Sequence, residues 1–173
     1  VQPSEFDRDK TLINVANGYI DLSSGELHDH DRKKMFSKEA NVEYSENAPC
    51  EEWQKFLKQI FDGDDELIEY VQRAVGYSLT GSTKEQIMFV LFGNGRNGKS
   101  VFLETISNLL GTYARTMRAS SIMVKQNSNA ANPDIARLAS ARLVTSSEPN
   151  EGFRIDEGLV KQLTGGDTVV ARE

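Results

Sequence analysis

The sequence predicts an α/β fold: a parallel sheet with helices in the second half of the chain, preceded by a small mixed, partly helical domain. Three observations lead to this prediction. Six consecutive apolar residues, Ile87–Phe92, are typical of a strand buried on both faces of a parallel sheet. A glycine-rich loop follows, and the apolar residues after it recur at helical spacing until Gly111. Charge divides the chain unevenly: residues 1–80 hold 17 acidic and 9 basic residues, whereas residues 81–173 hold 9 and 11.

The composition is that of an ordinary globular protein, with 38% hydrophobic and 27% charged residues among 173. No apolar run approaches the roughly 20 residues that span a bilayer, so we expect no membrane partner. The single cysteine, Cys50, excludes an internal disulfide and fits a reducing compartment. Cys50, His28 and His30 match no zinc-binding spacing and are interpreted as loop residues.

The first domain, residues 1–80, begins with a predicted β-hairpin. Two short apolar runs, Leu12–Val15 and Tyr19–Leu22, flank the turn signal Asn17-Gly18, and a third short strand is expected around Glu26-Leu27. Two amphipathic helices follow. The inward residues expected of the first helix are Trp53, Phe56, Leu57, Ile60 and Phe61, and those of the second are Leu67, Val71, Ala74, Val75 and Leu79.

The second domain, residues 81–173, carries the clearest chemical signal. Gly93–Ser100 fits the phosphate-binding pattern of Gly, four residues, then Gly-Lys-Ser, between the predicted strand and a helix. Amide N–H groups and the positive end of the helix dipole then face one point, which suits an anion. The alternative, a glycine-rich turn with a solvated lysine, is disfavoured by the strand and helix on either side. The nucleotide-binding residues expected are Gly93, Asn94, Gly95, Arg96, Asn97, Gly98, Lys99, Ser100 and Val101.

The carboxylate of Glu148 is the second candidate for a catalytic group. The β-prone segment Arg142–Glu148 ends in an acid about 50 residues after the loop. We expect Lys99 to reach the β- and γ-phosphates of ATP, Ser100 and Glu148 to serve Mg²⁺, and Lys99 and Glu148 to be the catalytic residues. A surface carboxylate is the alternative for Glu148.

Short elements are expected around these landmarks. They are a strand at Tyr113–Met117, a short helix opened by Asn132-Pro133-Asp134, a helix from Asp156-Glu157 to Gly165-Gly166, and an extended segment at Thr168–Val170.

Three segments together resemble superfamily 3 helicases, most closely the phage and plasmid primase-helicase group. They are the loop ending Asn97-Gly98-Lys99-Ser100, the segment Arg142–Glu148, and a third motif, Lys-x-Leu-Thr-Gly-Gly-Asp followed by Ala-Arg, at residues 161–172. This third motif is the specific one. The acidic first domain also resembles the helicase-associated domain that precedes the ATPase core in this group.

The resemblance implies a P-loop NTPase core of the AAA+ type, and a homo-hexamer that uses ATP and Mg²⁺ to translocate on single-stranded or replication-fork DNA. A primase domain or replication initiator is an implied partner, and the cytoplasm of a bacterium or phage-infected host the implied location. Lys161, Asp167 and Arg172 are possible contacts to DNA or nucleotide.

One departure from the family lowers the expected activity. The family's sensor asparagine strand and arginine finger lie beyond the third motif, and this sequence stops at Glu173. The missing strand normally lies between the loop strand and the Glu148 strand, so we expect an incomplete sheet. Loss of an arginine finger costs roughly 10³–10⁵ in rate, so this fragment is expected to hydrolyse ATP poorly. Alternatives are a P-loop kinase, a packaging ATPase, or a non-catalytic module that docks a replication partner.

Overall fold

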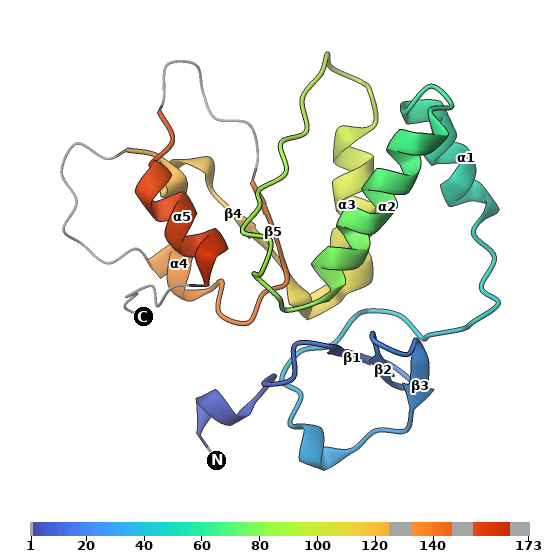
Figure 1. The fold of residues 1–173 in the computed structure, drawn as a ribbon, viewed down its shortest axis with the longest axis vertical. Helices are drawn as coiled ribbons and strands as arrows, with labels where there is room; N and C mark the ends of the chain where they lie inside the picture. The colour runs from blue at the N-terminus through green and yellow to red at the C-terminus, as the bar shows by residue number, and fades with distance from the viewer. Residues whose placement is uncertain (1, 125–132, 147–153, 167–173) are drawn as a thin grey trace.

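A computed structural model describes residues 2–124, 133–146 and 154–166 of the chain. The fold is mixed α/β, with a three-stranded antiparallel sheet near the N-terminus and a two-stranded parallel sheet later in the chain (Figure 1). Three longer helices, α1, α2 and α3, lie on one side of the parallel sheet, and α4 and α5 lie on the other (Figure 1).

The N-terminal sheet confirms the predicted hairpin and its third strand. Strands β1 (Leu12–Val15), β2 (Gly18–Asp21) and β3 (Glu26–His28) pair in that order, all antiparallel. Val15 pairs with Gly18, so the two-residue turn is Ala16-Asn17, one position earlier than predicted. Gly18 has a φ of 153°, and an added Cβ there would lie 2.2 Å from the His28 carbonyl oxygen. The glycine is therefore required for the close approach of β3.

Helices α1 (Glu51–Ile60) and α2 (Asp65–Leu79) occur where the apolar periodicity predicts them. Asp64 caps α2, because its side chain accepts a hydrogen bond from the Leu67 amide at 3.0 Å. One detail of the prediction is wrong: Leu67 is 39% exposed, and the neighbouring Ile68 packs against the core instead. Ile68 lies three residues before Val71 on the helix, which places it on the inward stripe.

The second half of the chain contains α3 (Lys99–Leu110), β4 (Ala114–Met117), α4 (Pro133–Ala136), β5 (Leu143–Ser146) and α5 (Glu157–Gly165). Single-turn 3₁₀ helices η1 to η4 occupy 3–5, 32–34, 111–113 and 119–122. Strands β4 and β5 pair in parallel, with Ala114 opposite Leu143. These elements match the expected short strand, short helix, β-prone segment and final helix.

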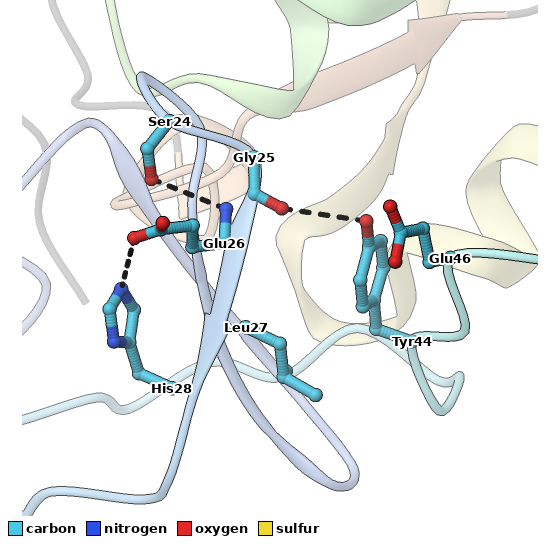
Figure 2. Close-up of a pocket in the computed structure, with 7 residues that line it drawn as sticks. All are labelled: Ser24, Gly25, Glu26, Leu27, His28, Tyr44 and Glu46. Carbon is cyan, nitrogen blue, oxygen red and sulfur yellow. Dashed lines mark hydrogen bonds and ion pairs between the residues drawn. The ribbon is translucent and has the colours of Figure 1, made fainter.

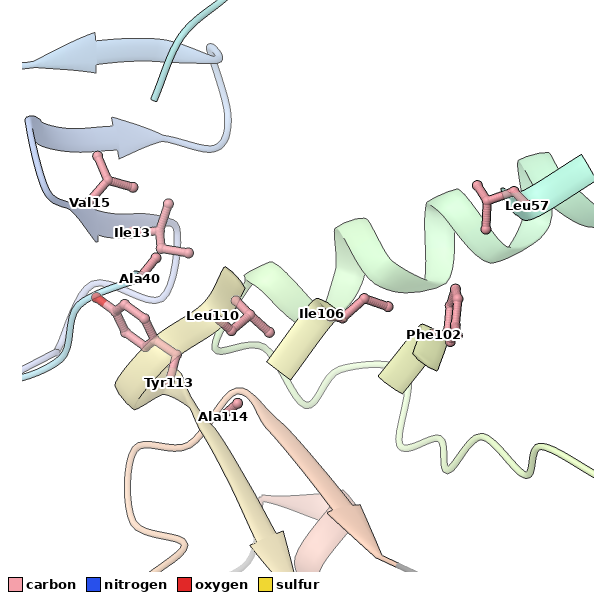
Figure 3. Packing of buried hydrophobic residues seen from close by; sticks show 9 residues of the cluster. All are labelled: Ile13, Val15, Ala40, Leu57, Phe102, Ile106, Leu110, Tyr113 and Ala114. Atoms are coloured by element: carbon pink, nitrogen blue, oxygen red, sulfur yellow. The ribbon is translucent and has the colours of Figure 1, made fainter. Parts of the chain in front are cut away.

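One hydrophobic core joins the two halves of the chain (Figure 3). Its buried members come from β1, residue 40, α1, α3, η3 and β4: Ile13, Val15, Ala40, Leu57, Phe102, Ile106, Leu110, Tyr113 and Ala114. Leu110 and Tyr113 have no exposed surface. The inward stripe of α3, at positions 102, 106 and 110, is therefore buried against residues that precede Gly81 in the sequence.

The predicted buried strand at Ile87–Phe92 is wrong. These six residues form no strand, and all are exposed, from 39% at Phe89 to 89% at Phe92. A strand requires a hydrogen-bonded neighbour, and within the described ranges β4 and β5 pair only with each other. The predicted extended segment at Thr168–Val170 lies outside the described residues. Over the same ranges, no helix combines the length and apolar character needed to cross a bilayer.

Candidate functional site

The glycine-rich loop Gly93–Ser100 leads directly into α3, as the sequence predicts. Its backbone is held in conformations that side chains resist: φ is 142° at Gly93, 62° at Arg96 and 86° at Gly98. A Cβ added at Gly93 would lie 2.5 Å from Asn97 Nδ2. The Asn97 side chain therefore lies against Gly93, whose φ of 142° is one that residues with a side chain rarely adopt.

The Lys99 side chain folds back over the loop. Its Nζ donates hydrogen bonds to the Gly93 carbonyl oxygen at 2.8 Å, to Asn97 Oδ1 at 2.9 Å and to the Asn94 carbonyl oxygen at 3.3 Å. The ammonium group is thus held against the loop by three oxygens of the loop itself. An anion entering the loop would meet this positive charge and could replace these acceptors.

The N-terminus of α3 has no side-chain cap. Gly98 occupies the cap position in a left-handed conformation, and the first helical hydrogen bond runs from the Phe102 amide to the Gly98 carbonyl oxygen. The amides of Lys99, Ser100 and Val101 precede that bond and have no acceptor within the helix. No acidic residue lies in this first turn. Amides, the dipole and the Lys99 charge all favour an anionic ligand at this position.

Of the remaining predicted site residues, the structure describes some and leaves others outside its described ranges. Ser100 and Val101 are exposed in the first turn of α3. Strand β5 ends at Ser146, and Glu148 lies outside the described residues, as do Asp167 and Arg172. Lys161 is exposed on α5. That helix ends near the segment before the loop, because a Cβ added at Gly166 would lie 2.6 Å from Thr83 Oγ1.

Sequence reasoning gave no structural role to Arg142. Its guanidinium donates hydrogen bonds to the carbonyl oxygens of Leu79 and Leu12, and it lies 4.4 Å from the centre of the Tyr113 ring. Burial lowers the pKa of Arg142 because the charged form loses hydration. Arg142 therefore joins α2, β1 and the start of β5, and no local sequence pattern reveals contacts over such separations.

A hollow on the N-terminal sheet is a second candidate (Figure 2). It lies along β3 beside Tyr44 and Glu46, and its ionisable pair is His28 with Glu26, 4.0 Å apart and both partly exposed. It is remote from the loop, which lies at the opposite end of the molecule in Figure 1. In the part of the chain that the structure describes, no three His, Cys, Asp or Glu side chains gather as metal ligands.

Comparison with known proteins identifies the first part of the chain. Residues 1–62 match the family described as "D5 N terminal like". The chain contains a D5-type N-terminal region. For this N-terminal region, the match confirms the predicted resemblance to a primase-helicase of the D5 type. The D5-type region, residues 1–62, includes the β1–β3 sheet and α1.

Three viral relatives match more of the chain, and each is named "putative helicase". The protein of Acanthamoeba polyphaga mimivirus is 32% identical over 172 residues, covering 96% of this chain and 18% of its own length. That of Frog virus 3 is 28% identical over 68% of this chain and 12% of its own length. That of Invertebrate iridescent virus 6 is 27% identical over 98% of this chain and 18% of its own length. The chain thus spans less than a fifth of these relatives, and none of the three comes from a phage or plasmid.

Proposed function

We propose that this chain is the D5-type region and nucleotide-binding segment of a helicase-related replication protein, and that Gly93–Ser100 binds ATP with Mg²⁺. The observation that carries the proposal is the uncapped, glycine-opened start of α3 with the Lys99 ammonium held over the loop. The helicase class comes from the names of the relatives and the D5-type match.

The donor groups of the loop fit a triphosphate. The free amides at the start of α3 would hold one phosphate, and Lys99 would move from the Gly93 and Asn97 oxygens to phosphate oxygens. The Ser100 hydroxyl is exposed beside them and would ligate the metal ion, with Glu148 as the proposed carboxylate. Bound Mg²⁺ would neutralise charge on the β- and γ-phosphates.

The exposed apolar surface near the loop also supports a helicase core that extends beyond this chain. Ile87–Phe92 and the outer residues of α3, Val101 and Leu109, are all more than a third exposed. A parallel sheet normally buries such residues on both faces. We propose that in the full-length protein another strand joins β5 to Ile87–Phe92, which then pairs as the sequence predicts. Hexamer formation and DNA translocation belong to that longer protein, and residues near Lys161, Asp167 and Arg172 are proposed to face DNA or nucleotide.

The first test is ATP binding by the Lys99→Ala variant. Removing the ammonium should weaken MgATP binding about 10- to 100-fold, since a charge-assisted contact to phosphate is worth roughly 1.5–3 kcal/mol. Calorimetric titration of the wild type and variant measures this. Lys84→Ala is the matched control, because Lys84 is exposed in the same half of the chain, ahead of the loop. Equal affinity in the wild type and Lys99→Ala would reject this use of the loop.

A kinase and a docking module remain the rival functions. A kinase would transfer phosphate to a small acceptor, whereas a helicase would release phosphate faster when single-stranded DNA is added to the full-length protein. A docking module would keep its partner in the Lys99→Ala variant and show no triphosphate binding in the wild type.

A further inference from the structure

Helix α1 of the D5-type region contacts the glycine-rich loop at Gly98. A Cβ added at Gly98 would lie 2.5 Å from Ile60 Cγ2 and 3.4 Å from Phe56 Cε2. The last turn of α1 therefore packs directly against Gly98, the N-cap residue of α3. Gly98 has a left-handed backbone, so its conformation and its packing both exclude a side chain.

The same helix also holds the first turn of α3. Phe102, three residues after Lys99, is 7% exposed. Trp53 stacks on it with ring centres 5.7 Å apart and planes at 17°, and Phe61 approaches its edge at 6.4 Å. Aromatic pairs in stacked and edge-on arrangements stabilise packing beyond the effect of their buried area. The position of α3 along its axis is therefore set in part by α1.

The opposite end of α3 is also fixed by the D5-type region. The Asn41 amide donates to the Leu109 carbonyl oxygen at 2.9 Å, and the Thr112 amide donates to the Glu39 carbonyl oxygen at 3.0 Å. Residues 39–41 and α1 thus hold both ends of the helix that carries Lys99.

We propose that the D5-type region is a positioning element of the nucleotide site, with Ile60 as the residue that fixes Gly98 and the loop in the geometry that accepts phosphate. This inference rests on the proposed function. Because coupling free energies are reciprocal, bound nucleotide must strengthen the docking of α1 by the same factor by which docked α1 strengthens nucleotide binding. Residues 1–62 would then respond to the state of the nucleotide site as well as help to build it.

The experiment uses the chain of residues 1–173 with MgATP. Ile60→Ala removes the Cγ2 methyl that lies against Gly98, whereas Ile60→Val keeps a methyl there. Gln59→Ala is the surface control on the same helix. Leu57→Val is the stability control, since Leu57 is 7% exposed in the core and is not one of the nearest neighbours of Gly98. Calorimetry gives the affinity, and hydrogen exchange of the α1 amides with and without MgATP gives the reciprocal effect.

We expect Ile60→Ala to weaken ATP binding about 5-fold or more, and Ile60→Val, Gln59→Ala and Leu57→Val to stay within about 2-fold of the wild type. MgATP should slow exchange in α1 of the wild type and have a smaller effect in Ile60→Ala. Unchanged affinity in a folded Ile60→Ala variant, or equal losses in Leu57→Val and Ile60→Ala, would overturn the positioning role. ATP binding by the wild type is measured before any α1 variant. If the wild type binds no ATP, the proposed function itself is wrong.

Discussion

The two ends of α3 are built in opposite ways. At the C-terminal end, backbone groups are paired with residues of the D5-type region: Asn41 with Leu109, and Glu39 with Thr112. At the N-terminal end, Gly98 offers no side-chain cap, and the Lys99 hydrogen bonds seen among the described residues go to oxygens of its own loop. The C-terminal end of α3 is thus paired with other parts of the protein, whereas the N-terminal end has no side-chain cap among the described residues.

Helices α2 and α5 have the side-chain cap that α3 lacks. Asp64 caps α2 and Asp156 caps α5, each through a side-chain oxygen that accepts an amide hydrogen bond at 3.0 Å. A carboxylate at the start of α3 would occupy the donors that a phosphate needs and would repel it. The N-terminus of α3, which lacks such a carboxylate, is therefore suited to an anion from outside the protein. Changes at the C-terminal end should therefore act mainly on stability, and should affect ATP affinity less than Ile60→Ala does.

The largest loss in the free energy of unfolding is expected from Gly111→Ala. Gly111 has a φ of 54°, and an added Cβ would lie 2.6 Å from the Glu39 carbonyl oxygen and 2.9 Å from the Asn41 amide nitrogen. Backbone strain and overlap together should cost roughly 2–5 kcal/mol of unfolding free energy. Urea unfolding measures the loss. Gly95→Ala is the matched control, because nothing lies within 4 Å of a Cβ there. Wild-type stability of Gly111→Ala would contradict the closed geometry of this end.

A smaller effect with a distinct pH dependence is expected from Tyr113→Phe. The Tyr113 hydroxyl accepts a hydrogen bond from the Asn14 amide at 3.1 Å, and losing it should cost about 1–3 kcal/mol at neutral pH. Burial, the main cause, raises the pKa of Tyr113 above its ordinary value of 10.0. As pH rises, the Tyr113 hydroxyl therefore ionises in the unfolded chain before it ionises in the folded protein. The stability that Tyr113 contributes is complete below pH 10 and declines as pH rises from 10 through the folded-state pKa.

Unfolding midpoints measured between pH 8 and 11 test this second prediction. The midpoint of the wild type should fall more steeply above pH 10 than that of Tyr113→Phe. Tyr70→Phe is the control, since Tyr70 is 52% exposed on α2. Parallel curves for the wild type and Tyr113→Phe would contradict the burial argument.

The smallest effect is expected from Thr112→Val. The Thr112 hydroxyl accepts from the Glu39 amide at 2.7 Å and donates to the Glu39 carbonyl oxygen at 3.1 Å. Both bonds are exposed, so the loss should be about 0.5–1.5 kcal/mol, measured by urea unfolding. ATP affinity should not change. A marked loss of ATP affinity in this variant would contradict the expectation that the C-terminal end of α3 contributes to stability and not to nucleotide binding.

Local periodicity was sufficient to predict most of the elements. The hairpin around residue 17, α1, α2, α3 and α5 all follow from apolar spacing and capping residues within a few turns of chain. The glycine-rich loop at the start of α3 was predicted for the same reason, because its pattern and its neighbours are contiguous in sequence.

The sequence pattern could not predict which strands pair or which distant elements contact one another. The apolar run Ile87–Phe92 has the composition of a buried strand, but composition does not specify a neighbour, and the segment stays exposed and unpaired with β4 or β5. The contact of Ile60 with Gly98 and the bonds of Arg142 to Leu12 and Leu79 join residues far apart in the chain. Such contacts depend on how elements pack, and no spacing rule within one element encodes them.

The hydrogen bond between Asn14 and Tyr113 has a consequence for synthesis on the ribosome. The two residues are 99 positions apart. At roughly 5–20 residues per second, the N-terminal sheet emerges about 5–20 s before the residues that cover Ile13 and Val15. During that interval these core side chains have no partner from α3. The nascent D5-type region therefore exposes apolar core side chains, which become buried only after α3 has left the exit tunnel.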